Sequence, residues 1–392
     1  MSPQELLICA VSAAVTGNSD RVPDCGDADW QVLFQLSAQQ KLTAPVYGAL
    51  RAAMPERVQR AWRSAALQDA ALQSRRTEAF FALYRRLSER GCRPIVVKGI
   101  LCRETYPEPD ARISSDEDLY IPAPQYPAFH RIMRQLGMAC EEPDYKNAHE
   151  TRYFGDDLMV EGHWELFPRD HSLLNALNAL NDGFFRRCVT EEHHGVSLRV
   201  LEATDHLSFL LLHAFKHFIN SGVGIRQLCD VARWAKTHEI DWERVKQTME
   251  PARAVCFAGA VFDFCERWLE LPFPPGFPRA DCGALLSDAL SGGIYGSSDM
   301  SRRHSGSITL AAAENARKPS RFAAVLRAVF PNRAVMEMSF PWVKRSALLL
   351  PAAWSVRIAR YLRSRGEGNE AAQSLQIGSE RLELLRRYEV IE

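Results

Sequence analysis

The sequence predicts a mixed α+β fold in which helical regions flank a core that contains the strands. Residues 2–91 show helical periodicity, residues 92 to about 200 alternate short apolar runs with one helix, and helical periodicity returns after residue 205. The chain is also long enough for several compact units. We therefore expect a helical N-terminal region, a mixed core, a helical domain that closes a cleft, and a helical, basic C-terminal region, at residues 1–90, 91–204, 205–275 and 276–392.

Composition excludes a general attraction to nucleic acid. The 392 residues include 48 Lys or Arg and 48 Asp or Glu, so the formal net charge is zero. A protein without net charge exerts little long-range attraction on a polyanion. Binding of a polyanion would therefore need a local group of basic residues. The hydrophobic content of 46% is ample for a sizeable core.

The sequence also predicts a cytoplasmic protein with reduced thiols. Residues 1–5 lack the basic and apolar stretches of a secretory signal, and no apolar run approaches the ~20 residues that span a bilayer. The ten cysteines are scattered without a C-x-x-C pair, which excludes a zinc ribbon. We expect most of them to be small core residues.

In the N-terminal region, helices are expected to begin near Glu5 and to include residues 30–36 and 58–89. The last of these segments is Ala-rich and amphipathic. Gly91 is expected to end it, because glycine readily adopts a positive φ, and residues 95–97 then predict a short buried strand.

Strands and helices in the rest of the chain are predicted from their periodicity and turn residues. Thr204 and Asp205 are expected to cap the first helix after the core, and His193-His194-Gly195 is expected to form a hairpin turn. The predicted strands are residues 118–121, 149–154, 158–166 and 196–201, and the predicted helices are residues 124–136, 207–219, 224–238, 242–249 and 252–269.

The stretch from residue 95 to 121 carries the candidate chemistry. Lys98-Gly99 follows the first strand directly and precedes a helical stretch at residues 100–105. Gly99 would let the backbone approach a ligand, N–H groups at the helix start would point at that ligand, and Lys98 would add a positive charge. This arrangement suits a phosphate, although a Lys-Gly pair alone often marks only a tight turn.

Asp116-Glu117-Asp118 supplies candidate metal ligands. In an extended chain the side chains of Asp116 and Asp118 face the same way, and Glu117 faces the other way. Two carboxylates on one face can hold Mg²⁺, which takes its other ligands from water and substrate phosphates. An isolated D-x-D is more often a solvated acidic turn. The nearby Lys98-Gly99 turn favours the metal-binding interpretation.

Together these motifs resemble those of bacterial nucleotidyltransferase-like proteins of the DNA polymerase beta superfamily. The resemblance covers most of residues 90–245 and implies a nucleotidyltransferase-type mixed sheet. The matching elements are Val97-Lys98-Gly99, Tyr106-Pro107, Arg112, Asp116 with Asp118, Glu161-Gly162-His163-Trp164-Glu165, and a helical pair with His213, His217, Arg226 and Asp230.

The resemblance implies transfer of a nucleotide from an NTP, with ATP as the expected donor, to a hydroxyl group. Asp116 and Asp118 would bind Mg²⁺ or Mn²⁺. Glu161 would complete the metal site or act as the general base. His163 and Glu165 would share the strand face of Glu161 if that strand is regular, so both are further candidates for the cleft. The acceptor stays open among a protein or peptide, a small molecule, a sugar and an RNA end.

Arg112 is a candidate for neutralising the triphosphate together with Lys98 and Gly99. The residues also permit two other interpretations of Arg112, namely an exposed side chain or an ion pair with Asp110 or Asp116.

The helices after residue 205 supply weaker candidates. His213 and His217 are spaced to share a helix face, but no Glu follows His213, so we favour packing or lining of the cleft over zinc. Lys216 and Arg226 are candidates for binding nucleotide phosphates, although surface cations are common. Asp230 lies among apolar neighbours and is expected to form a buried pair, for which Arg226 is one candidate partner.

Residues 317–365 form a basic segment with eleven Lys or Arg and the single acid Glu337. Such a segment could lie on an anionic membrane surface or bind an acidic partner. It could also consist of helices packed on the core, which is the interpretation we favour.

Two other functions are compatible with the motifs. A non-catalytic binding module could keep the fold and the nucleotide pocket, since well-studied enzymes of the superfamily have Gly-Ser or Gly-Gly where this chain has Lys98-Gly99. A metal-dependent phosphohydrolase would release phosphate without an acceptor.

Overall fold

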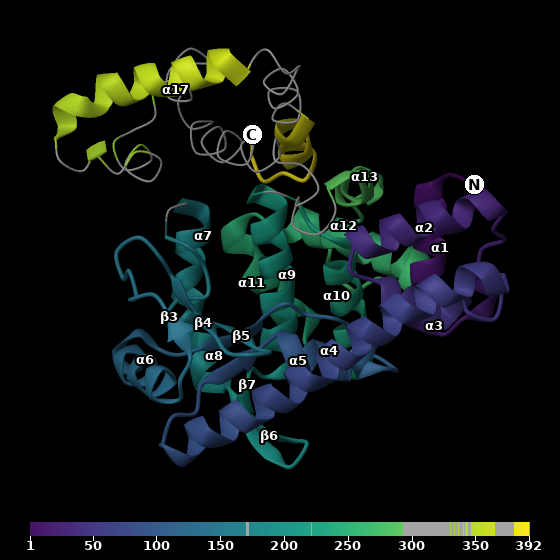
Figure 1. The fold of residues 1–392 in the computed structure, drawn as a ribbon, viewed down its shortest axis with the longest axis horizontal. Coiled ribbons are helices and arrows are strands. Elements are labelled where there is room, and N and C mark those ends of the chain that lie inside the picture. The colour runs from purple at the N-terminus through teal and green to yellow at the C-terminus, as the bar shows by residue number, and fades with distance from the viewer. Residues whose placement is uncertain are drawn as a thin grey trace.

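A computed structural model shows a seven-stranded mixed sheet surrounded by helices (Figure 1). It describes residues 1–169, 172–220, 222–292 and 380–391, together with short stretches and single residues between 330 and 364. The predicted α+β class is confirmed.

Helices fill the N-terminal region. Ser2 caps the first of them through a reciprocal pair, in which Ser2 Oγ accepts from the Glu5 N–H at 3.2 Å and Glu5 Oε2 accepts from the Ser2 N–H at 2.7 Å. Gly91 follows the last helix with a φ of 73°, as expected. The helices are α1 (Pro3–Thr16), α2 (Asp27–Gln39), α3 (Thr43–Leu50) and α4 (Glu56–Glu89).

Helix α3 was not predicted. Its eight residues include Pro45 and Gly48, which both lower helix propensity. The helix packs against α1 and α4. Tertiary packing therefore stabilises a segment that local propensity disfavours.

The sheet has the strand order β3-β4-β5-β2-β1-β7-β6. At its centre, β2 pairs in parallel with β5 and antiparallel with β1, and β1 pairs in parallel with β7. The strands are β1 (Ile95–Val97), β2 (Glu117–Tyr120), β3 (Ala139–Cys140), β4 (Glu150–Phe154), β5 (Met159–His163), β6 (Val189–His193) and β7 (Val196–Val200).

Two strands and some strand ends differ from the prediction. β3 has only two residues, and β6 is mostly exposed and polar, so neither shows the apolar alternation of a half-buried strand. β5 ends at His163 rather than residue 166, and Trp164 packs between Tyr126 and Tyr145. The hairpin turn before β7 is confirmed, with two successive positive φ angles at positions 194 and 195.

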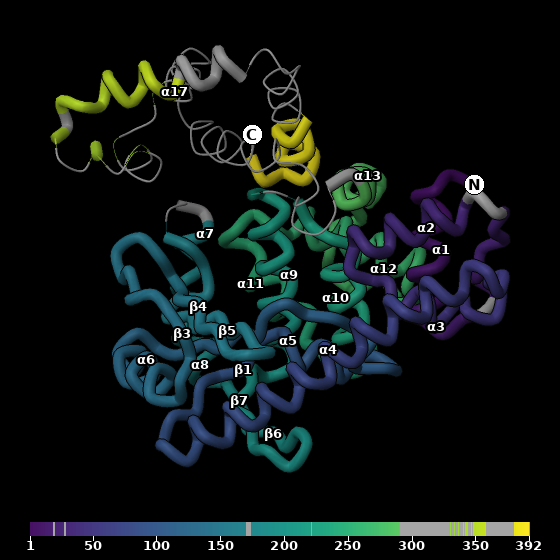
Figure 2. Tube along the Cα trace, viewed as in Figure 1, coloured from purple at the N-terminus to yellow at the C-terminus, as the bar shows by residue number. Residues whose placement is uncertain are grey.

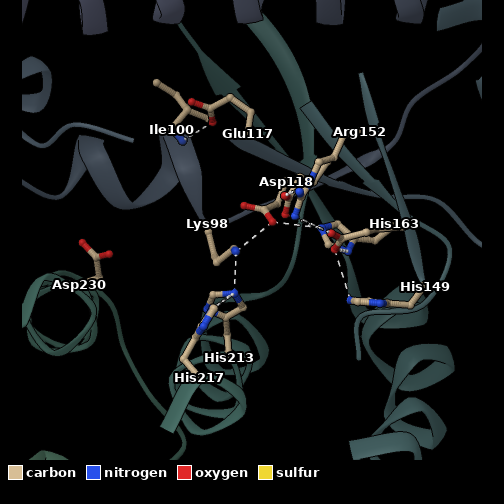
Figure 3. A network of polar contacts seen from close by, with 12 residues as sticks. Lys98, Ile100, Glu117, Asp118, His149, Arg152, His163, His213, His217 and Asp230 are labelled. Atoms are coloured by element: carbon tan, nitrogen blue, oxygen red, sulfur yellow. Dashed lines mark hydrogen bonds and ion pairs between the residues drawn. The ribbon is translucent and has the colours of Figure 1, made fainter. Parts of the chain in front are cut away.

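Helices lie against both faces of the sheet near the strands β2 and β5. On one face, α6 (Tyr126–Gln135) packs closely against Gly162, where an added Cβ would lie 2.8 Å from Phe129. Side chains alternate along a strand, so Glu161 and His163 face away from α6. Helix α9 (Ala203–Asn220) lies on that other side, and its side chains His213 and His217 project toward Lys98 (Figure 3).

Thr204 and Asp205 do not cap α9. The helix begins at Ala203, so both residues lie within its first turn. The Asp205 carboxylate instead accepts hydrogen bonds from Arg187 at 2.7 and 3.1 Å. The prediction failed because the helix starts before both residues, and the Asp205 carboxylate is bound by Arg187 instead of by the helix backbone.

Most helices after the core match the predicted segments within a few residues. Helices α7 (Ser172–Leu177) and α8 (Asn181–Arg187) were not predicted. The matching helices are α9 and, after it, α10 (Ile225–Thr237), α11 (Trp242–Met249) and α12 (Val255–Leu269). Helices α13 (Gly283–Gly292) and α17 (Leu350–Ser364) lie in the C-terminal region expected to be helical, for which no helix bounds were predicted.

The C-terminal segment 380–391 packs beside α13 (Figure 2). Arg381 forms a buried ion pair with Asp288 at 3.2 Å. The hydroxyl of Tyr388 accepts a hydrogen bond from the Leu285 N–H at 3.0 Å. One apolar cluster extends from the N-terminal helices through the sheet to this segment.

The basic segment is only partly described. Helix α17 contains Arg357, Arg360 and Arg363, and Arg333 also lies in the described part. The other basic residues of the segment lie outside the described residues: Arg317, Lys318, Arg321, Arg327, Lys344, Arg345 and Arg365. Contact with a membrane or an acidic partner therefore stays a prediction.

All ten cysteines are free thiols. Four of them are buried and six are partly buried. The predicted core position is therefore confirmed in full for Cys102, Cys229, Cys265 and Cys282. Among the described residues, no helix combines the length and the apolar character needed to cross a membrane.

Candidate active site

The turn after β1 is built around the carboxylate of Glu117. Lys98 and Gly99 both have positive φ angles, of 56° and 46°, and lead into the six-residue helix α5 (Gly99–Glu104). Glu117 Oε2 accepts a hydrogen bond from the Ile100 N–H at 2.9 Å. A Cβ at Gly99 would lie only 2.0 Å from this oxygen, so the glycine makes room for the carboxylate.

The expectation that backbone N–H groups of this turn point at a phosphate is corrected. The Ile100 N–H binds Glu117, and the Lys98 N–H donates to His206 Nε2 at 3.1 Å. The anion at the start of α5 is therefore a side chain of the protein. Glu117 also pairs with Arg103 at 2.5 Å in a fully buried contact, which compensates its charge.

The side chain of Lys98 connects the sheet to α9. Its ammonium nitrogen lies 2.9 Å from Asp118 Oδ1 and 2.9 Å from His213 Nε2, and His213 lies 3.2 Å from His217 (Figure 3). Burial, and then the charge of Lys98, hold the pKa of His213 well below its usual value. The neutral imidazole of His213 can therefore accept a hydrogen bond from the ammonium group of Lys98. Together with His217, it lies opposite the sheet (Figure 3).

Two carboxylates and an imidazole meet on β2 and β5. Asp118 is the direct register partner of Glu161, and Tyr120 is the partner of His163. His163 Nε2 lies 3.0 Å from Asp118 Oδ1 and 4.0 Å from Glu161 Oε2. The ligand atoms of Asp118, Glu161 and His163 all lie within 4.8 Å of one another. These three residues could hold a metal ion.

The two carboxylates of this group have opposite pKa shifts. Burial tends to raise the pKa of Asp118, but Lys98 and His163 outweigh it and lower the pKa. For Glu161, burial raises the pKa, and the charges of Glu150 and Asp118 raise it further. Asp118 is therefore the more firmly ionised ligand, whereas Glu161 holds a proton more readily and suits proton transfer.

Asp116 lies outside this group. It is half-buried and comes just before β2, so it does not share the regular strand geometry of Asp118. Neither of the metal-capable groups among the described residues includes it. Its charge nevertheless acts on Lys41 and on Glu161, which places it near the same space.

Glu165 does not share the strand face of Glu161. Because β5 ends at His163, Glu165 follows the strand and pairs with Arg169 at 2.5 Å. His163, in contrast, lies on the face of Glu161 as predicted.

Arg112 does not face the candidate site. Its guanidinium group donates to both carboxylate oxygens of Asp230, at 3.1 and 2.5 Å, and Tyr106 donates to the same carboxylate at 2.9 Å. Arg112 and Asp230 are both about 95% buried. The partner of Asp230 is therefore Arg112 rather than Arg226, and the pair joins the loop before β2 to α10.

The two cations predicted on the later helices lie at different places. Arg226 is buried and donates a hydrogen bond to the carbonyl of Ile113, in the loop that leads to Asp116. Lys216 is half-buried on α9, and its charge interacts with Glu150 and Lys98. Of the two, Lys216 lies beside the group formed by Asp118 and His163.

Sequence reasoning missed His149, Glu150 and His206. A signal for Glu150 was available: the strands around residues 150–154 and 159–163 are joined by a short turn, and the register of that hairpin places Glu150 opposite His163. His206 gave no such signal, because its contact with the backbone of Lys98 joins segments more than a hundred residues apart.

One comparison identifies the family. The family model described as uncharacterised nucleotidyltransferase matches residues 26–270, which is more than half of the chain and includes every residue of the candidate site. Neither the curated proteins nor the solved structures give a match to the chain. With its mixed sheet and its carboxylates on adjacent strands, the chain belongs to this family of uncharacterised nucleotidyltransferases.

Proposed function

We propose that the chain transfers a nucleoside monophosphate from an NTP, with ATP as the expected donor, to a hydroxyl group. The observation that carries this proposal is the register pair formed by Asp118 and Glu161 on adjacent parallel strands. The family match supports nucleotidyl transfer as the reaction class.

The donor set fits a hard divalent cation. Asp118 and Glu161 offer carboxylate oxygens, and His163 offers a ring nitrogen within the same 4.8 Å. Mg²⁺ is commonly bound through one or two carboxylates, with water and phosphate oxygens as the other ligands. Mg²⁺ or Mn²⁺ bound there would supply stabilisation of the negative charge on the phosphate oxygens. Asp116 is proposed as a further ligand on this side of the sheet.

The chain's own cations would position the triphosphate. Lys98 projects between Asp118 and His213, and Lys216 is placed on the same helix as His213. Lys98 is largely buried and Lys216 half-buried, and this partial shielding from water strengthens their interaction with phosphate oxygens. Lys41 and Arg226 add positive charge near Asp116.

Glu161 is proposed either to complete the metal site or, when the ion is held without it, to act as the general base. The acceptor oxygen would attack the α-phosphorus as the bond to the bridging oxygen of the β-phosphate breaks, and pyrophosphate would leave. In that role Glu161 would take up the hydroxyl proton, and the rise in its pKa caused by burial and by the charges of Glu150 and Asp118 would favour this uptake. The acceptor class stays open among a protein or peptide, a small molecule, a sugar and an RNA end.

A specific observation favours a second candidate, a non-catalytic nucleotide-binding or protein-interaction module. The N–H groups of Lys98 and Ile100 bind His206 and Glu117. These N–H groups would otherwise be natural phosphate ligands. A module of this kind would need Asp118 and Glu161 for ligand binding at most, and not for turnover.

Thermal unfolding of the purified chain with each NTP, with and without Mg²⁺, tests the proposal. A ligand at a hundred times its dissociation constant stabilises a protein by about 2.7 kcal/mol. We expect one NTP to raise the melting temperature only with Mg²⁺, and the D118N/E161Q variant to lose this shift. Glu165→Gln is the matched control, because Glu165 is a nearby carboxylate outside the metal-capable group.

Product analysis separates the candidates. Release of pyrophosphate, together with transfer of the α-phosphate to an acceptor, supports nucleotidyl transfer. Release of inorganic phosphate without transfer indicates a phosphohydrolase. A Mg²⁺-dependent rise in melting temperature, with no product from any of the acceptor classes named above, supports the binding module.

A further inference from the structure

A second metal-capable group lies beside the first. It consists of His149, Glu150 and His163, whose ligand atoms lie within 4.8 Å of one another. Glu150 and His163 are direct partners on the antiparallel strands β4 and β5, and His149 immediately precedes β4. Figure 3 shows His149 and His163 on the side of Asp118 that is away from Lys98.

The nitrogens of this group converge on one carboxylate oxygen without forming hydrogen bonds to it. Glu150 Oε2 lies 3.2 Å from His163 Nδ1 and 3.3 Å from His149 Nε2. Both nitrogens are buried, and within the described part of the chain neither has a hydrogen-bond partner. Buried polar atoms normally have partners, so these two nitrogens call for an explanation.

We propose that His149, Glu150 and His163 bind a divalent transition-metal ion of the zinc class, at a site that shares His163 with the first group but does not use the carboxylates Asp118 and Glu161. Tetrahedral zinc with ligand bonds of ~2.0–2.1 Å requires ligand atoms about 3.3 Å apart, close to the two observed separations. Two imidazoles and one carboxylate suit zinc-class ions, whereas Mg²⁺ prefers oxygen ligands.

The surroundings of His163 favour this assignment. His163 uses Nδ1 toward Glu150, and its Nε2 lies 3.0 Å from Asp118 Oδ1. Histidines that bind metals usually donate their other ring N–H to a carboxylate, which fixes the tautomer and orients the ring. Asp118 occupies that position. Its side chain and that of His163 are each about 95% buried, so the orientation is constrained.

One feature opposes metal binding. The charge of Lys216 interacts with Glu150, so an ion would have to compete with a nearby ammonium group. Arg152 also donates to Glu150, at 3.5 Å, so a polar cluster of Glu150, the two histidines and these two cations is the alternative to a metal site. The two possibilities differ in whether a stripped protein takes up an ion.

Cobalt titration of the metal-stripped full-length chain tests the proposal, because tetrahedral Co²⁺ absorbs visible light and substitutes for zinc. With excess Mg²⁺ present to occupy Asp118 and Glu161, we expect uptake of one Co²⁺ per chain, displaced by Zn²⁺. His149→Gln and Glu150→Gln should each weaken binding at least tenfold. Glu165→Gln is the control, because Glu165 is a nearby carboxylate outside both metal-capable groups, and it should leave the affinity unchanged within threefold. Asp118→Asn should weaken binding about ten- to a hundredfold, the usual effect of losing such an orienting carboxylate.

The outcomes decide between the two explanations. No uptake by the folded wild-type chain, or uptake that His149→Gln leaves unchanged, would overturn the proposal. X-ray absorption at the zinc edge of the wild-type chain gives a test that needs no variant: nitrogen and oxygen ligands with imidazole scattering support the site. Sulfur ligands would assign the ion to cysteines and overturn it. None of these measurements depends on nucleotidyl transfer.

Discussion

The ammonium group of Lys98 lies 2.9 Å from Oδ1 of Asp118, and both side chains are almost fully buried. The lysine therefore supplies positive charge at the carboxylate that the proposed function assigns to a metal ion. A divalent cation at Asp118 must share this carboxylate with the ammonium group or move it away. If a metal ion took its place at Asp118, the ammonium group of Lys98 could bind the phosphate oxygens of the nucleotide instead.

Lys98→Met should destabilise the chain and make its stability more dependent on Mg²⁺. Removing one partner of a buried ion pair costs about 3–5 kcal/mol, and we expect the lower end because His163 also contacts Asp118. A metal ion at Asp118 would replace the lost charge. Urea unfolding with and without Mg²⁺ should therefore show a larger Mg²⁺ effect in the variant than in the wild type.

Lys236→Met is the control for this experiment. Lys236 lies on α10 and donates to the backbone carbonyl of Leu269 rather than to the site. It should leave the Mg²⁺ effect unchanged. An equal Mg²⁺ effect in Lys98→Met and the wild type would argue against metal binding at Asp118.

Gly99→Ala should be far more destabilising than Gly91→Ala. Both glycines have positive φ angles, so both replacements carry the left-handed backbone cost of about 1–2 kcal/mol. Only at Gly99 would the new Cβ collide with Glu117, whereas nothing lies within 4 Å at Gly91. Displacing Glu117 also removes the partner of the Ile100 N–H, so we expect an additional loss of about 2–3 kcal/mol.

Chemical unfolding of the two glycine variants measures this difference directly. The backbone cost is common to both, so the difference between them reports the packing of Glu117 against the turn. Equal losses would show that the turn tolerates a side chain and that the carboxylate of Glu117 can move away at little cost.

Arg112→Met should lower stability without weakening nucleotide binding by the folded chain. The pair with Asp230 is buried, and losing one member costs about 3–5 kcal/mol. The double variant R112M/D230L should lose less than the sum of the two single variants, because no unpaired charge then stays buried. Nucleotide affinity is measured at a temperature where each variant is folded. If Arg112→Met bound nucleotide ten times more weakly with little change in stability, Arg112 would have to contact the triphosphate after all.

The local elements near the site could be predicted because their signals lie within a few residues. Local periodicity and turn chemistry predict the short strand before Lys98, the positive φ of Gly91 just after α4, and the alternation of Glu161 and His163. The two strands that were missed are a polar edge strand and a two-residue strand, which carry no such pattern.

The partners of charged side chains could not be predicted in the same way. Asp230 binds Arg112 across more than a hundred residues, although Arg226 is one helical turn away. Gly99 was expected to make room for a phosphate, but the group that it accommodates is Glu117. In both cases several residues of suitable charge exist, and only the packing of distant elements selects one of them.

His206 should make the chain less stable as the pH falls below neutrality. Burial, with smaller effects from His238 and Lys98, lowers the pKa of His206 to about 3, whereas its usual value is 6.5. Between these values the unfolded chain binds a proton that the folded chain does not, so stability falls as the pH drops from 6.5 toward 3. At pH 5 the loss from this residue is about 2 kcal/mol, at ~1.4 kcal/mol per pKa unit.

His206→Gln tests this relationship, because a glutamine can still accept the Lys98 N–H but does not titrate. Urea unfolding at several pH values between 7 and 4.5 should give a shallower decline for His206→Gln than for the wild type. The exposed His194 provides the control, and His194→Gln should follow the wild-type decline. If stability declined equally with pH in the wild type and in both variants, His206 would have to bind its proton as readily in the folded chain as in the unfolded chain. The Lys98 N–H would then need another acceptor, and the turn that carries Lys98 toward Asp118 would loosen in acid.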